Sequence, residues 1–60
     1  MTDVILLMED DASGRQLAAF NLKKAGYRVI EAETGEEGLR ALEKEVPDLV
    51  ILDLMLPDVD

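Results

Sequence analysis

The sequence predicts an α/β fold in which three parallel strands alternate with two helices. Two apolar runs, residues 4–8 and 49–57, are typical of strands covered on both faces of a sheet. Between them, two stretches with helix-capping residues flank a shorter alternating segment, residues 27–32. Each connection is long enough for the crossover that parallel strands need. The predicted order is therefore strand, helix, strand, helix, strand.

The first predicted strand ends in three consecutive acids. Residues 4–8 are all apolar, and Glu9, Asp10 and Asp11 follow directly. The next helix begins either at Ser13, as part of a capping box, or with Asp11 as a competing cap. The sequence leaves this choice open.

The first predicted helix extends to about residue 25. Gly26 follows, and we expect it to end the helix in the left-handed conformation. The apolar face of this helix is predicted to comprise Leu17, Ala18, Leu22 and Ala25.

The second strand and helix are predicted to lie at one side of the sheet. Residues 27–32 alternate, as expected for a half-exposed edge strand. Thr34 caps the second helix in a Thr-x-x-Glu box with Glu37. Gly38 inside this helix costs roughly 1 kcal/mol against Ala, which a close helix–sheet contact would explain. Pro47 ends the helix. Its apolar side is predicted to comprise Leu39, Ala41 and Leu42.

The predicted sheet order is 2-1-3, with the first strand in the middle. The carboxyl ends of neighbouring parallel strands meet at one edge, where ligands bind in open α/β sheets. Glu9 and Asp10 end the first strand, and we expect Asp53 at the end of the third. The sequence therefore predicts three carboxylates at one place.

The composition excludes several kinds of function. The 60 residues contain no Cys and no His, so thiolate metal sites and the usual general base are absent. The net charge of −8 argues against nonspecific binding to nucleic acid or anionic membranes. No apolar stretch reaches the roughly 20 residues of a membrane span. The start lacks the basic region of a signal peptide, so we expect one small cytoplasmic domain.

Carboxylates without His or Cys favour a hard cation, and Mg²⁺ is the natural candidate. The cation would relieve carboxylate repulsion and let Asp53 act as a nucleophile that forms an aspartyl phosphate. The plainer alternatives are that Glu9, Asp10 and Asp11 form a solvated helix start and that Asp53 is an ordinary turn residue. Dinucleotide binding is rejected, because the first turn is acidic and not glycine-rich.

The combined motifs resemble the receiver domain of bacterial response regulators. The resemblance is carried by the strand ending in residues 9–11 and by segment 47–57, with further matches at 24–27 and 32–39. It covers residues 1–60 and implies a flavodoxin-like fold. It also implies a phosphoacceptor rather than an enzyme, with a sensor histidine kinase as its partner and Mg²⁺ as its cofactor.

The resemblance implies roles for individual residues. Asp53 corresponds to the aspartate that is phosphorylated, and Asp10 to the direct Mg²⁺ ligand. Glu9 is its acidic neighbour, acting through water, and Met55 offers a backbone carbonyl to the metal. Asp11 is expected to start the helix rather than bind metal.

Length is the departure from the family. A family receiver has further strands, which carry a switch Ser or Thr and a Lys that cannot be assigned here. We therefore expect residues 1–60 to be a truncated, amino-terminal half in which phosphotransfer is impaired. The third strand becomes an exposed apolar edge, which predicts a homo-oligomer. The alternatives are a self-associating half-fold or fragment with a structural role only, and, more weakly, an Asp-dependent phosphohydrolase.

Overall fold

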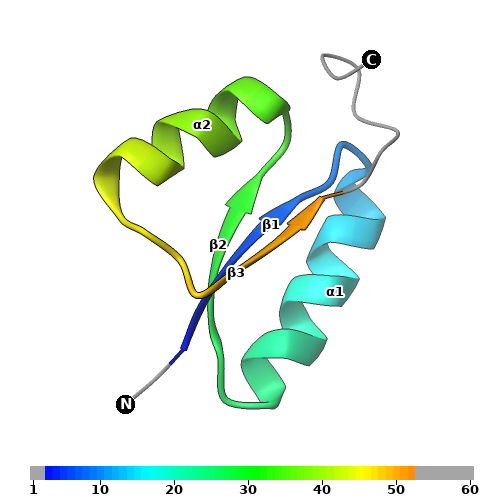
Figure 1. Cartoon of the computed structure of the whole chain (residues 1–60). Helices are drawn as coiled ribbons and strands as arrows, with labels where there is room; N and C mark the ends of the chain where they lie inside the picture. Colours follow the sequence, from blue (N-terminus) through cyan, green and yellow to red (C-terminus); the bar gives the residue numbers. More distant parts are fainter. Residues whose placement is uncertain (1–2, 53–60) are drawn as a thin grey trace.

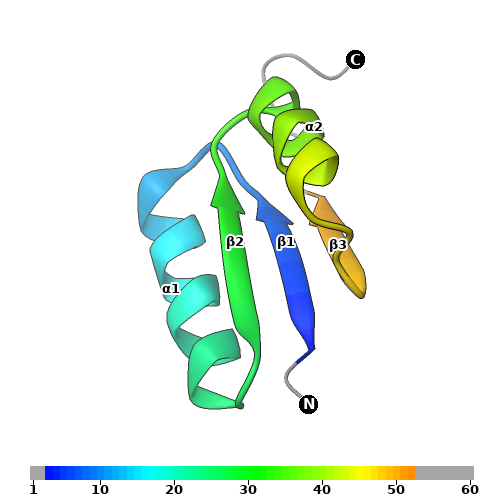
Figure 2. The same ribbon diagram turned by 90° about the vertical axis from the view of Figure 1, so that its left-hand side faces the viewer.

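The computed structural model describes residues 3–52 of the chain. Its three strands are parallel and lie in the order β2-β1-β3, with one helix on each face of the sheet (Figures 1 and 2). The predicted α/β class, element order and sheet order are confirmed. The elements in chain order are β1 (Val4–Met8), α1 (Ala12–Lys24), β2 (Arg28–Ala32), α2 (Gly35–Lys44) and β3 (Leu49–Leu52).

Asp48 fixes the register between β1 and β3. Its backbone N–H donates to the carbonyl of Val4 at 2.7 Å, and its Oδ2 accepts from the Val4 N–H at 2.7 Å. The ladder that starts here ends with Met8 opposite Leu52. The carboxyl ends of the two strands are therefore level with each other.

The helix starts are set by side-chain caps. Asp11 is the cap of α1, because its Oδ2 accepts from the backbone N–H of Gly14 at 2.8 Å. This resolves the choice between Asp11 and Ser13. Thr34 caps α2 as predicted, with its Oγ1 accepting from the N–H of Glu37 at 3.1 Å. Within residues 3–52, neither helix is long and apolar enough to span a membrane.

Gly26 ends α1 as predicted, with a φ of 103°. Its N–H donates to the carbonyl of Lys23 at 3.0 Å, and the N–H of Tyr27 donates to Leu22 at 3.1 Å. These two bonds form a Schellman motif, which satisfies carbonyls that the last turn would otherwise leave unpaired.

The hydrophobic core is centred on β1, which the helices cover from both sides. Leu6 and Met8 join Ala32 in one buried cluster, against which Ile30 and Ala41 pack. Neighbouring side chains of a strand face opposite sides of the sheet. The alternate residues of β1, Ile5 and Leu7, therefore face α1. The buried apolar residues are Ile5, Leu6, Leu7, Met8, Ala19 and Ala32.

The predicted apolar face of α1 is partly wrong. Leu17 is 65% exposed, and Ala25 is also exposed. The buried residue is Ala19, between the half-buried Ala18 and Leu22. The helix is therefore rotated from the predicted orientation, and small side chains let it approach the sheet.

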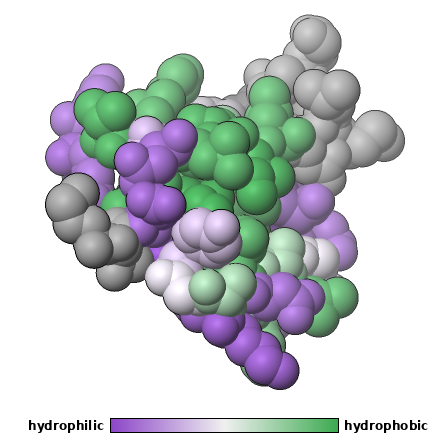
Figure 3. Space-filling model, turned by 60° about the horizontal axis from the view of Figure 1, so that its bottom comes forward, coloured by the Kyte–Doolittle hydropathy of each residue, from purple (hydrophilic) through white to green (hydrophobic). Residues whose placement is uncertain are grey.

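The prediction that the third strand is buried is also wrong for residues 49–52. All four side chains of β3 are exposed, because in the described part of the chain both helices pack against β1 and β2 rather than over β3. The expected exposed apolar edge is thereby confirmed for these residues. Figure 3 shows a broad area of hydrophobic residues on this side of the surface.

Candidate functional site

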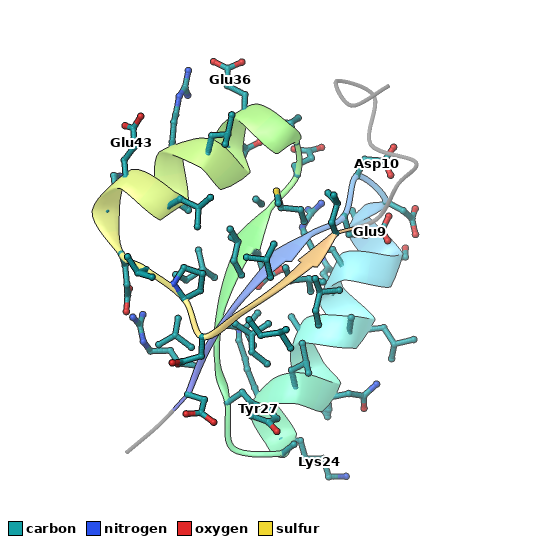
Figure 4. All side chains as sticks on the ribbon, in the orientation of Figure 1. Glu9, Asp10, Lys24, Tyr27, Glu36 and Glu43 are labelled. Atoms are coloured by element: carbon teal, nitrogen blue, oxygen red, sulfur yellow. The ribbon has the colours of Figure 1, made fainter. Side chains whose placement is uncertain are left out.

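The acidic turn, residues 9–11, lies where β1 ends and α1 begins. Glu9 and Asp10 follow Met8 directly and are both half-buried. Figure 4 shows the two side chains at the carboxyl end of β1, beside the end of β3. The structure therefore brings the first two predicted site residues to the expected edge of the sheet.

The backbone of Glu9 is held from two sides. Its N–H donates to the carbonyl of Ala32 on β2 at 3.0 Å. Its own carbonyl accepts from Nη1 of Arg15 at 2.8 Å. The Glu9 carboxylate also accepts from the N–H of Asp11 at 3.1 Å. The turn is thus an ordered structure rather than a loose solvated loop.

Asp11 has a structural task. One of its carboxylate oxygens caps α1 through Gly14, and its carbonyl accepts the first helical bond from Arg15 at 2.8 Å. The expectation that Asp11 starts the helix is therefore confirmed. Of the three acids in the turn, Glu9 and Asp10 are the pair left for ligand binding.

The predicted third carboxylate, Asp53, lies outside the described residues, as does Met55. The register of β3 still bears on it. Leu52 is opposite Met8 in the sheet. In the sequence, Asp53 follows Leu52 and Glu9 follows Met8. The convergence of all three carboxylates stays a prediction.

The chemistry of the acidic turn suits a hard divalent cation. Glu9 and Asp10 offer carboxylate oxygens, the ligands that Mg²⁺ takes in proteins. Within residues 3–52 no group of three or more Asp, Glu, His or Cys side chains is placed to hold a metal. The described pair therefore fits part of a Mg²⁺ site, which needs further oxygen ligands from elsewhere.

Charged pairs away from the turn leave its negative charge in place. Arg28 pairs with Glu45, and the hydrogen bond and then the charge of Glu45 raise the pKa of Arg28 above its ordinary value. Arg28 begins β2, whereas Glu9 follows the opposite end of β1. This cation is therefore too far along the sheet to offset the acidic turn.

Arg15 is the residue of this region that the sequence interpretation missed. Its side chain is 16% exposed, with Nε 3.6 Å from the Glu31 carboxylate on β2. A signal was present in the sequence: Arg15 precedes Ala18, Ala19 and Leu22 at the spacing of one helix face. An arginine on the face that meets the sheet needs a polar partner there.

The sequence matches the response regulator receiver domain over residues 5–60, a range that includes the acidic turn and Asp53. The chain belongs to the response regulator receiver domain family. The resemblance drawn from the motifs is thereby confirmed. The half-sheet described above is consistent with the flavodoxin-like fold expected of a receiver domain.

Relatives of this receiver chain include transcriptional regulators. It is 47% identical over 60 residues to the alkaline phosphatase synthesis transcriptional regulatory protein PhoP of Bacillus subtilis (strain 168), covering 100% of this chain and 25% of that protein. It is 45% identical over 56 residues to the transcriptional regulatory protein AfsQ1 of Streptomyces coelicolor, covering 93% and 25%. For the transcriptional regulatory protein GlrR of Escherichia coli (strain K12) the identity is 45%, covering 93% and 13%. The chain thus spans a quarter or less of these relatives.

Proposed function

We propose that this receiver domain accepts a phosphoryl group on Asp53 in a Mg²⁺-dependent reaction, with a sensor histidine kinase as the donor. The phosphorylated chain would be the output of a two-component signalling pathway. We also propose a cytoplasmic location, because the phosphoryl group derives ultimately from ATP. In this proposal the chain is a phosphoacceptor and the kinase is the enzyme.

The observation that carries the proposal is the level ending of β1 and β3. Met8 pairs with Leu52, and an acid follows each of them in the sequence. Carboxyl ends of parallel strands form the ligand-binding edge of open α/β sheets. The half-buried pair Glu9 and Asp10 supplies the acidic part of that edge.

Several residues would share the cation. Asp10 would bind it directly, Glu9 through water, and Asp53 and the carbonyl of Met55 would complete the protein ligands. When bound, Mg²⁺ offsets the repulsion between the carboxylates and an incoming phosphoryl group. The backbone of the acidic turn is already ordered by the bonds of Glu9 to Ala32 and Arg15, so this backbone needs little rearrangement.

The chemical step is a transfer to a carboxylate oxygen. An oxygen of Asp53 attacks phosphorus, and a P–O bond forms as the P–N bond to the donor imidazole breaks. The imidazole leaves with the electron pair and takes up a proton. The product is an acyl phosphate, which water can hydrolyse to regenerate the aspartate.

Intact-mass measurement after incubation with acetyl phosphate tests this proposal. With Mg²⁺ a fraction of the wild-type chain should gain the mass of one phosphoryl group, since impaired transfer is expected for residues 1–60, and should lose it on addition of hydroxylamine. The isosteric variant Asp53→Asn should gain none, and Asp10→Asn should gain much less. Glu43→Gln, which changes an exposed acid on α2, is the matched control and should behave as wild type.

Two outcomes would contradict the proposed function. One is equal phosphorylation of the wild type and Asp53→Asn. The other is a modified wild type whose yield is the same with Mg²⁺ and with excess chelator.

A second candidate function, self-association through β3, is favoured by a different observation. We propose that two copies of this chain pair along their third strands. Val50 and Ile51 are 41% and 37% exposed, and they face opposite sides of the sheet. An exposed apolar edge strand presents unpaired backbone groups and apolar surface to another chain.

The other edge strand of the sheet, β2, carries charged side chains. Glu31 on β2 pairs with Arg15 and Lys23, and Arg28 on the same strand pairs with Glu45. Charged residues on an edge strand oppose pairing with another chain, whereas β3 carries only Leu, Val and Ile. This difference favours β3 as the site of association.

Light scattering after size-exclusion chromatography tests self-association. The wild type should elute with the mass of two chains, and Ile51→Lys should shift it toward one. Leu39 on α2 is 64% exposed, so its predicted place on the apolar side of this helix is wrong, and Leu39→Lys should leave the mass unchanged. A folded wild type with the mass of a single chain at high concentration would overturn this second candidate.

A further inference from the structure

We propose that Arg15 is a positioning residue for the acidic turn, which it holds by the carbonyl of Glu9 so that the carboxylates are preformed for a cation. The inference rests on the proposed Mg²⁺ site and adds a residue that is not one of its ligands. Arg15 would not contact the cation. It acts through the backbone between Glu9 and Asp10.

The contact that carries the proposal is a hydrogen bond to a peptide group. Nη1 of Arg15 donates to the carbonyl oxygen of Glu9 at 2.8 Å in a partly buried position. That oxygen belongs to the peptide joining Glu9 to Asp10. Because the N–H of Glu9 is held by Ala32, both of its backbone polar groups are fixed. The orientation of the Glu9–Asp10 peptide therefore depends on Arg15.

Arg15 is itself held in place by two neighbours. Its own N–H donates to the carbonyl of Asp11 at 2.8 Å, in the first turn of α1. Its Nε lies 3.6 Å from Oε1 of Glu31, and Nζ of Lys23 lies 3.6 Å from Oε2 of the same carboxylate. The guanidinium thus joins the start of α1 to both β1 and β2. An arginine can do this because its planar fork offers several donors in fixed directions.

The charge of Arg15 and its hydrogen bond to Glu9 predict opposite effects on the binding of a cation. A positive group beside the acidic turn repels Mg²⁺, so removing the charge alone would tighten binding. Removing the hydrogen bond would loosen the turn and weaken binding. We expect the effect of the hydrogen bond to be the larger one, because the charge of Arg15 is offset by Glu31 whereas its bond to Glu9 is direct.

An NMR titration with Mg²⁺ alone tests whether loss of Arg15 weakens or tightens the binding of the cation. In Arg15→Met the dissociation constant should rise about tenfold, as expected when a group that orients a metal ligand is lost. Arg15→Lys, which keeps a charge and a donor, should lie between this variant and the wild type. Lys23→Met is the matched control, because it removes the other cation paired with Glu31, and it should bind as the wild type does.

A metal-free measurement separates the inference from the proposed function. Hydrogen exchange at the amide of Glu9 should be faster in Arg15→Met, with no Mg²⁺ present. Should Arg15→Met not fold, the same comparison is made with Arg15→Lys.

Two results would overturn the role of Arg15. One is an Arg15→Met variant that binds Mg²⁺ as tightly as the wild type or more tightly. The other is unchanged exchange at Glu9. A wild type that binds no Mg²⁺ contradicts the proposed function instead, and the exchange measurement then decides the role of Arg15 by itself.

Discussion

Gly38 of α2 lies so close to Met8 of β1 that a side chain at position 38 would force the Met8 side chain to move. A Cβ atom at position 38 would meet the sulfur of Met8 far inside contact distance and its Cγ at 2.9 Å. Both residues are buried. This is the close helix–sheet contact expected from a glycine inside a helix, and it places α2 directly over the end of β1, next to the acidic turn.

Gly38→Ala should destabilise the protein despite the better helix propensity of Ala. The propensity gain is about 1 kcal/mol, and the overpacking cost is about 1–3 kcal/mol, so a net loss of about 1 kcal/mol is expected. Urea unfolding followed by circular dichroism measures it. In a Met8→Ala background the clash is absent, and the same substitution should become stabilising. A loss of equal size in both backgrounds would show that Met8 is not the obstacle.

Asp48 should stabilise the pairing of β1 with β3 through its side chain. Asp48→Ala loses the 2.7 Å bond from the N–H of Val4, and the free energy of unfolding should fall by about 1–2 kcal/mol. Asp48→Asn keeps an acceptor and should lose less. Amide exchange at Val4, measured by NMR, reports the bond locally. Protection of this amide that is unchanged in Asp48→Ala would contradict the assignment.

Gly26 should be sensitive to any residue with a side chain, although nothing crowds it. A Cβ at this position would meet open space, but the φ of 103° is one that L residues rarely adopt. Gly26→Ala should therefore cost about 1 kcal/mol, and Gly26→Asn less, because Asn tolerates this conformation better. Thermal unfolding compares them. Equal melting temperatures for all three proteins would mean that α1 can end in another way.

Local rules explain why much of the fold could be predicted from the sequence. The caps at Thr34 and Gly26 depend on residues three to five positions away, so the signal lies within a short window. The two apolar runs identified β1 and β3 for the same reason. The strand order followed from the crossover rule once the elements were known.

Tertiary contacts explain what could not be predicted. Leu17 was expected to be buried and Ala19 was not, because the sequence does not show which side of α1 the sheet occupies. The exposure of β3 depends on both helices lying over β1 and β2. The hydrogen bond of Arg15 was not predicted, because a long side chain can reach many partners. Which of them it contacts, here Glu9, depends on the packing.

The candidate site was predictable to the extent that strand ends can be located. Glu9 and Asp10 lie where the end of β1 was expected, half-buried at the carboxyl edge. Asp53 and Met55 lie outside the described residues, so their part in the site stays a prediction. The resemblance already separated Asp11 from the ligands, as the residue that starts the helix. The bond of Asp11 to Gly14 does so in the structure.

A double-mutant cycle on Mg²⁺ affinity tests most directly whether Asp10 and Asp53 belong to one cation site. The dissociation constant is measured for the wild type, Asp10→Asn, Asp53→Asn and the double variant. Residues that share a ligand are strongly non-additive, so each single substitution should remove most of the binding and the double should add little. Losses that add, or an Asp53→Asn variant that binds Mg²⁺ as the wild type does, would contradict a shared site.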